Sequence, residues 1–147
     1  MRGPFDISRS VARFRELPIS CLRSAETFGF VHASLSLMHM PDVAACLRQV
    51  SQLLRDGGVF FAVDADAIPI QVGMMPRAWV DGSKVVIPFA THAFEDVVAE
   101  AHRSGLIVRE AGRVPPRQEI VARHPKFQRY AGAPCLYYVI ATKGAVG

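Results

Sequence analysis

The chain of 147 residues is 50% hydrophobic and 20% charged, a composition that suits one globular domain with a buried core. It has no run of about 18 apolar residues and no signal-peptide pattern after Met1, so we expect a soluble, cytoplasmic protein without a membrane partner. The net charge of +4 comes from 17 Lys and Arg residues scattered singly, which favours a solvated basic surface over a nucleic-acid partner.

The first predicted elements form a βαβ unit. A mostly apolar run over 28–37 is typical of a buried strand, and the turn signal Pro41-Asp42 follows it. Apolar residues then recur at helical spacing at Val43, Leu47, Val50 and Leu54. The turn Asp56-Gly57-Gly58 is expected to end that helix, and the apolar run 59–63 predicts a second strand. Because the connections are short, we expect the two strands to lie parallel in one sheet.

The later elements alternate between loops and regular structure. The segment 68–90 contains five Pro and Gly residues and is predicted to be an apolar loop or a set of short broken helices. Thr91 is expected to cap a helix that Gly105 ends, and a strand over 106–114 follows. A polar loop over 115–134 then leads to a final strand over 135–142.

The block from Phe28 to Gly58 resembles the fourth and fifth strands of class I S-adenosylmethionine-dependent methyltransferases of type 11. In both, a strand leads to a His before a Pro-Asp turn (His39 to Asp42), an amphipathic helix and a glycine turn into the next strand. The likeness continues through the Tyr-rich last strand and covers 28–144, most of the chain. It implies an α/β fold: a partial Rossmann-like sheet of parallel strands with an antiparallel C-terminal strand, and helices packed on the sheet.

The resemblance implies that the chain corresponds to the C-terminal half of the family's domain. Residues 1–27 are then an N-terminal extension or a remnant of the preceding half, and 28–147 form the methyltransferase-like α/β domain. The family's Gly-x-Gly loop and the acid that holds the ribose have no counterpart before Phe28, and both would contribute binding energy. We therefore expect weak or absent cofactor binding by this truncated chain alone. A start upstream of Met1 would account for the missing half.

The resemblance also places a site at the carboxyl end of the first strand. Ala33, Ser34 and Leu35 would border the methionine part of S-adenosylmethionine, the expected cofactor. His39 would stand near the transferred methyl group or the substrate, where it could accept a proton from a substrate hydroxyl as a general base. The alternative is that His39 satisfies backbone groups in the turn before Pro41.

A substrate pocket is predicted from five further residues: Asp64, Asp66, Met74, Met75 and Trp79. Asp64 and Asp66 lie two apart at a strand end, so they share a face and could hold a substrate amine or a metal, although they also fit ordinary polar strand ends. The two methionines and Trp79 fit either a pocket for an apolar substrate or a cover for a sheet edge or partner chain. Three widely separated cysteines and two distant helical histidines predict no metal site.

Two functions are open at this point. The first is S-adenosylmethionine-dependent methyl transfer to a small-molecule acceptor, a reaction that needs alignment more than acid–base groups. The second is a noncatalytic interaction domain that lacks cofactor binding. Without its other half the sheet has an exposed strand edge, which a homodimer or a partner subunit would cover.

Overall fold

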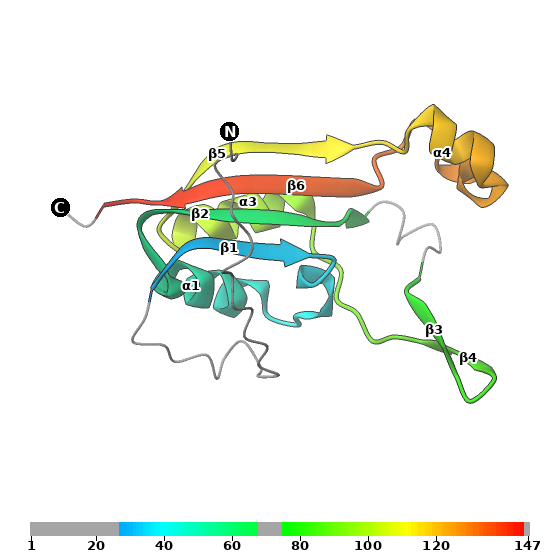
Figure 1. The fold of residues 1–147 in the computed structure, drawn as a ribbon, viewed down its shortest axis with the longest axis horizontal. Helices are drawn as coiled ribbons and strands as arrows, with labels where there is room; N and C mark the ends of the chain where they lie inside the picture. The colour runs from blue at the N-terminus through cyan, green and yellow to red at the C-terminus, as the bar shows by residue number, and fades with distance from the viewer. Residues whose placement is uncertain (1–26, 68–74, 146–147) are drawn as a thin grey trace, which may run out of the picture.

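The computed structural model describes residues 27–67 and 75–145 of the chain (Figure 1). The strands are β1 (Phe28–Ser34), β2 (Leu54–Ala65), β3 (Arg77–Val80), β4 (Ser83–Val86), β5 (Leu106–Val114) and β6 (Leu136–Lys143). The helices are α1 (Val43–Leu53), α3 (Phe94–Arg103) and α4 (Gln118–Arg123), with two 3-10 helices, η3 (Leu37–His39) and η4 (Pro125–Tyr130). No helix in the described ranges has the length and apolar character that crossing a membrane requires.

Four strands form one mixed sheet in the order β1-β2-β6-β5. β1 and β2 are parallel, with Val31 opposite Phe60, and α1 connects them as the predicted βαβ crossover. β6 lies antiparallel between β2 and β5, so the last strand of the chain is central in the sheet. The expected α/β fold, with parallel strands and an antiparallel C-terminal strand, is confirmed.

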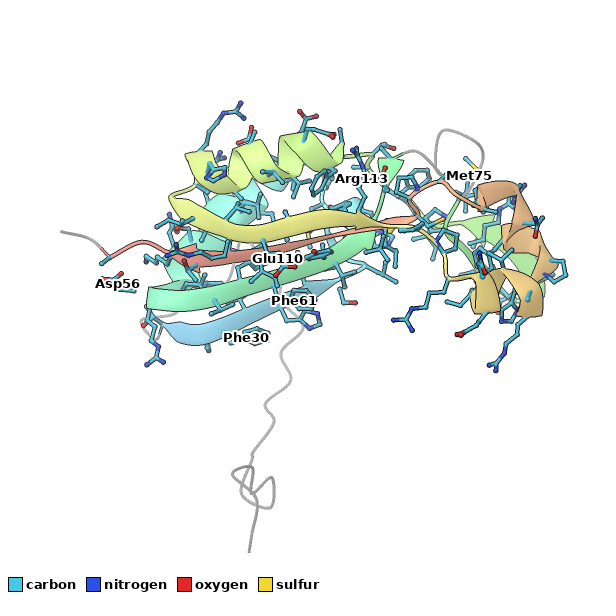
Figure 2. The ribbon with its side chains drawn as sticks, turned by 90° about the horizontal axis from the view of Figure 1, so that it is seen from above. Phe30, Asp56, Phe61, Met75, Glu110 and Arg113 are labelled. Carbon is cyan, nitrogen blue, oxygen red and sulfur yellow. The ribbon has the colours of Figure 1, made fainter. Side chains whose placement is uncertain are left out.

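α1 and α3 cover one face of the sheet (Figure 2). Their buried side chains pack against alternate residues of the two central strands, which are Phe60 and Ala62 from β2 and Val139 and Ala141 from β6. Removing this apolar surface from water is the main force that holds the helices to the sheet. The core therefore lies on one side of the sheet.

The opposite side of the sheet, here called the open face, also carries large apolar side chains. Phe30, His32 and Phe61 lie on it, and Figure 2 shows Phe30 and Phe61 on the side away from α3. The rings of His32 and Phe61 stack with centroids 5.2 Å apart, and Phe30 is 58% exposed. Parallel strands are usually buried on both faces, so this face is unusual for its strand type.

The first helix ends earlier than the glycine turn predicts. Leu53 is the last residue of α1, and Leu54, predicted to be helical, has an extended backbone and pairs with Phe28. The predicted stop Asp56-Gly57-Gly58 lies inside β2, where Gly57 has a φ of 70° and the register between the strands shifts. Pairing with β1 supplies backbone partners from Leu54 onward, and this overrides the local helical pattern.

Two segments predicted to be loops contain regular structure. Residues 77–86 form a hairpin of β3 and β4 around Asp81 and Gly82, whose φ angles are 47° and 76°. The polar segment 115–134 contains α4 and η4. The prediction that Thr91 caps α3 is also wrong, because the helix begins at Phe94 and its N-cap is Ala93.

Candidate functional site

The carboxyl ends of the parallel strands β1 and β2 meet at one edge of the sheet, here called the rim. β1 ends at Ser34, earlier than the predicted end at residue 37, because Leu35 adopts a left-handed backbone with a φ of 47°. The N–H of Leu35 donates to the carbonyl of Val63 at 2.9 Å, which fixes this turn to β2. Ala33 lies on the helix side of the sheet, whereas Ser34 and Leu35 are exposed at the rim.

Asp64, near the end of β2, is fully buried and supports the turn that follows β1. Its Oδ2 atom accepts hydrogen bonds from the N–H groups of Leu37 at 2.6 Å and Met38 at 3.2 Å. Both groups lie in the first turn of η3, where N–H groups have no partner within the helix. The carboxylate thus holds η3 against the sheet, and contact with a substrate amine stays a prediction.

Asp66 follows β2 and is also fully buried. Its Oδ2 accepts a hydrogen bond from Nε of Arg113 on β5 at 2.8 Å. The same guanidinium binds both carboxylate oxygens of Glu95, at 2.7 and 2.9 Å, and lies 5.0 Å from the centroid of the Phe94 ring. The hydrogen bond from Arg113 lowers the pKa of the exposed Glu95 carboxyl. Asp66 therefore ties β2 to β5 and α3, and a role in substrate binding stays a prediction.

His39 is the last residue of η3 and is exposed. Its Nδ1 atom lies 2.9 Å from the carbonyl oxygen of Pro88. Because a carbonyl can only accept, Nδ1 carries the proton, and the neutral ring keeps its lone pair on Nε2. This bond reaches a distant segment and not the turn before Pro41 that the alternative invoked. His39 thus has a defined tautomer with its basic nitrogen available.

A second histidine fixes the same segment to η3. The Nε2 atom of His92 lies 2.7 Å from the carbonyl oxygen of Met40, and the N–H of Ala90 donates to the carbonyl of Met38 at 2.6 Å. Residues 88–92 are therefore held along the turn that carries His39, which restricts the position of its ring.

A hollow of about 410 Å³ opens where the rim meets α4 and η4. Its lining is almost wholly hydrocarbon and consists of Leu35, Ala65, Val114, Pro115, Pro116, Arg117, Ile120, Phe127, Cys135 and Leu136. Burial raises the pKa of the Cys135 thiol, as does the charge of Asp66, so the thiol is neutral at physiological pH. The hollow has the size and lining of a small-molecule site.

Of the predicted site residues that the structure describes, only Leu35 lines this hollow. His39, Asp64 and Asp66 lie around the rim but outside the lining, and the two carboxylates are bound to internal partners. Trp79 is 73% exposed on β3 and Met75 is 44% exposed, and neither lines the hollow. Met74 lies outside the described residues.

The part of the lining that α4 and η4 contribute was not predicted from the sequence. Ile120 and Phe127 belong to a segment predicted to be a polar loop. Their apolar character among charged neighbours was the available signal. It was too sparse to predict a six-residue helix.

The sequence also matches a family of known proteins. The profile of the family described as a methyltransferase domain matches residues 4–106. The chain belongs to this family. The resemblance carried by the block from Phe28 to Gly58 is thereby confirmed. The predicted boundary between an N-terminal extension (1–27) and the methyltransferase-like domain (28–147) stays a prediction. A comparison with curated proteins gave no match.

Several solved methyltransferase structures share the fold. An S-adenosylmethionine-dependent enzyme from Mesorhizobium loti has a TM-score of 0.64 and 19% identity, over 86% of this chain and 67% of its own. A putative S-adenosylmethionine-dependent methyltransferase from Listeria monocytogenes has a TM-score of 0.68 and 14% identity, over 89% of this chain and 68% of its own. The N-methyltransferase NodS from Bradyrhizobium japonicum WM9, in complex with S-adenosyl-L-homocysteine, has a TM-score of 0.55 and 12% identity. The match covers 88% of this chain and 53% of the NodS chain. These comparisons confirm the class I fold, and this chain spans about half to two-thirds of each neighbour.

Proposed function

We propose that this methyltransferase-family domain serves S-adenosylmethionine-dependent methyl transfer to a small-molecule acceptor. One structural observation carries the proposal: the exposed turn of Ser34 and Leu35 borders an apolar hollow at the carboxyl ends of two parallel strands. Ligands of open α/β sheets bind at such strand ends. The neighbour NodS holds S-adenosyl-L-homocysteine, the demethylated form of the same cofactor, which supports this choice.

The described residues fit one end of this cofactor. Ser34 offers an exposed hydroxyl and Ala33 is small, so the strand end can approach a ligand closely, and both would hold the methionine end together with Leu35. When bound, S-adenosylmethionine supplies a methyl group on a positively charged sulfur. Within residues 27–67 and 75–145 no Gly-x-Gly turn follows a strand, so the described part offers no backbone cradle for the nucleoside end.

The chain's own residues would orient the acceptor and take up its proton. The hollow excludes water from the acceptor body and limits its orientations, which is the larger contribution in a displacement reaction. His39 would accept the proton of an acceptor hydroxyl at Nε2, because the Pro88 carbonyl keeps the other proton on Nδ1.

Isothermal titration of the purified chain with S-adenosylhomocysteine tests the proposal, with the mass in solution measured on the same sample. Saturable micromolar binding that is lost in Ser34→Tyr, which places a large ring at the rim, would support the proposal and overturn the weak or absent binding expected from the missing Gly-x-Gly loop. Ser83→Tyr on the distant hairpin is the matched control and should bind as the wild type does. No binding up to millimolar ligand would exclude an independent enzyme.

The open face favours a second candidate function, a noncatalytic interaction domain. Phe30 on β1 and Ile107 on β5 are 58% and 42% exposed, and the strand register places both in one row across the sheet. β1 is also an edge strand, with no neighbour on its outer side among the described residues. A second copy or another subunit would cover this surface. A dimer that Phe30→Gln dissociates, in a chain that does not bind S-adenosylhomocysteine, would favour this alternative.

A further inference from the structure

We infer that the hollow at the rim is the acceptor pocket and that it takes acceptors with an uncharged hydrocarbon body. The inference rests on the proposed methyl transfer and names the chemical class of its acceptor. Three parts of the chain form the hollow: the turn after β1, the adjoining ends of β2, β5 and β6, and the pair of α4 and η4. Figure 1 shows α4 beyond the sheet, at the end where the arrows of β1 and β2 point.

The lining determines which ligands the hollow can accept. Leu35, Ile120 and Phe127 line it together with two prolines and the apolar ends of three strands. A polar ligand group would lose its hydrogen bonds to water there without replacement, which disfavours sugars, amino acids and nucleotides. A hydrocarbon body is stabilised instead, in proportion to the apolar area that leaves water. The lining therefore selects an apolar acceptor.

The ionisable groups around the hollow point to an uncharged acceptor body. The Cys135 thiol is neutral at physiological pH, and the nearby Asp66 carboxylate is bound to Arg113 outside the lining. Arg117 is the one charged residue in the lining, and it is exposed and thus hydrated. Among the described residues the lining offers no buried charge, so a charged body would lose hydration without gaining a buried partner.

The position of the hollow connects it to the expected chemistry. Leu35 belongs both to the lining and to the rim turn, so an acceptor atom beside it lies next to the turn proposed to hold the methionine end. The volume of about 410 Å³ falls within the range of about 300–1,000 Å³ typical of small-molecule pockets. A fused-ring alcohol such as 2-naphthol has the required hydrocarbon body and one hydroxyl group.

The test is a calorimetric titration of the full chain with 2-naphthol, with and without saturating S-adenosylhomocysteine. myo-Inositol serves as the polar counterpart. Ile120→Trp enlarges a side chain that lines the hollow, and Ile107→Trp is the matched control, because the two isoleucines are 45% and 42% exposed and Ile107 lies on the open face. We expect saturable binding of 2-naphthol and none of myo-inositol. Binding should weaken at least about tenfold in Ile120→Trp, about 1.4 kcal/mol, and stay unchanged in Ile107→Trp.

Two results would overturn the inference. The first is no 2-naphthol binding by a chain that binds S-adenosylhomocysteine. The second is weakening in Ile107→Trp but not in Ile120→Trp, which would place the probe on the open face. The proposed function fails separately: a chain that binds 2-naphthol but not S-adenosylhomocysteine has an apolar ligand site without the cofactor. If Ile120→Trp is unfolded at the assay temperature, Ile120→Asp brings a charge into the same lining and should weaken binding likewise.

Discussion

The Oδ2 atom of Asp64 accepts the backbone N–H of Leu37 at 2.6 Å, and this bond ties the end of β2 to the turn that carries the candidate site. Asp64 and Leu37 are 0% and 1% exposed, so water cannot replace the carboxylate when it is removed. The positions of Leu35 and His39, on either side of Leu37, thus depend on a carboxylate inside the protein.

Asp64→Ala is expected to lower the free energy of unfolding by about 3 kcal/mol, because two N–H groups of η3 lose their acceptor, one of them fully buried. Asp56→Ala is the control: Asp56 is exposed at the start of β2, and its removal should change stability by less than about 0.5 kcal/mol. Urea unfolding measures both values. Equal midpoints for the two variants would contradict the assigned role of Asp64.

Gly58 marks a close approach between β1 and β2. A Cβ atom there would lie 2.8 Å from the carbonyl oxygen of Arg55 and 3.0 Å from that of Phe28. Backbone atoms cannot turn aside as a flexible side chain can, so Gly58→Ala should destabilise the fold by about 2 kcal/mol. In Gly144→Ala the added atom would meet the Ile107 side chain at 3.6 Å, an ordinary contact. This control should unfold in urea close to the wild type, and a similar loss in both would rule out the steric explanation.

Much of the fold is predictable because local sequence determines it. The apolar run before Pro41 and the short crossover to β2 are enough to predict two parallel strands. The hairpin at Asp81 and Gly82 was also within reach, since an Asp-Gly pair favours a tight turn, but the surrounding prolines and glycines obscured the short strands. Helix ends were less predictable, because the pairing of Leu54 with Phe28 depends on a strand formed elsewhere in the chain.

The candidate site was harder to predict for the same reason. Asp66 and Arg113 are 47 residues apart in the sequence, so nothing local indicates that the carboxylate is bound inside the protein. The hollow likewise combines Leu35 with Ile120 from α4, and only the folded sheet brings them together. The resemblance correctly indicated the family and the fold, whereas the partners of each side chain follow from tertiary packing.

Cys46 on α1 should make stability fall at alkaline pH. Burial, with a smaller effect of Asp42, raises the pKa of its thiol from 9.0 to about 11. Because the folded state holds the thiol proton more tightly than the unfolded state, this group's contribution to stability is fully present below pH 9.0. It is lost as the pH rises toward about 11. Between pH 8 and pH 11, the free energy of unfolding should therefore fall less in Cys46→Ala than in the wild type. Burial also raises the pKa of Tyr137, which leaves a residual slope in the variant. Parallel curves would contradict the prediction.

His39→Asn separates the proposed base from the hydrogen bond that positions it. The Asn amide can still donate to the Pro88 carbonyl in place of Nδ1, but nothing replaces the basic Nε2 atom. With 2-naphthol as test acceptor, we expect kcat to fall about 100-fold while the affinity for S-adenosylhomocysteine stays unchanged. His92→Gln is the matched control, because its amide can take the place of Nε2 beside the Met40 carbonyl. Equal rates in His39→Asn and the wild type, or no transfer by the wild type, would remove His39 from the mechanism. A purely structural role would leave both histidine variants close to the wild-type rate, since each amide keeps the hydrogen bond that holds this segment beside η3.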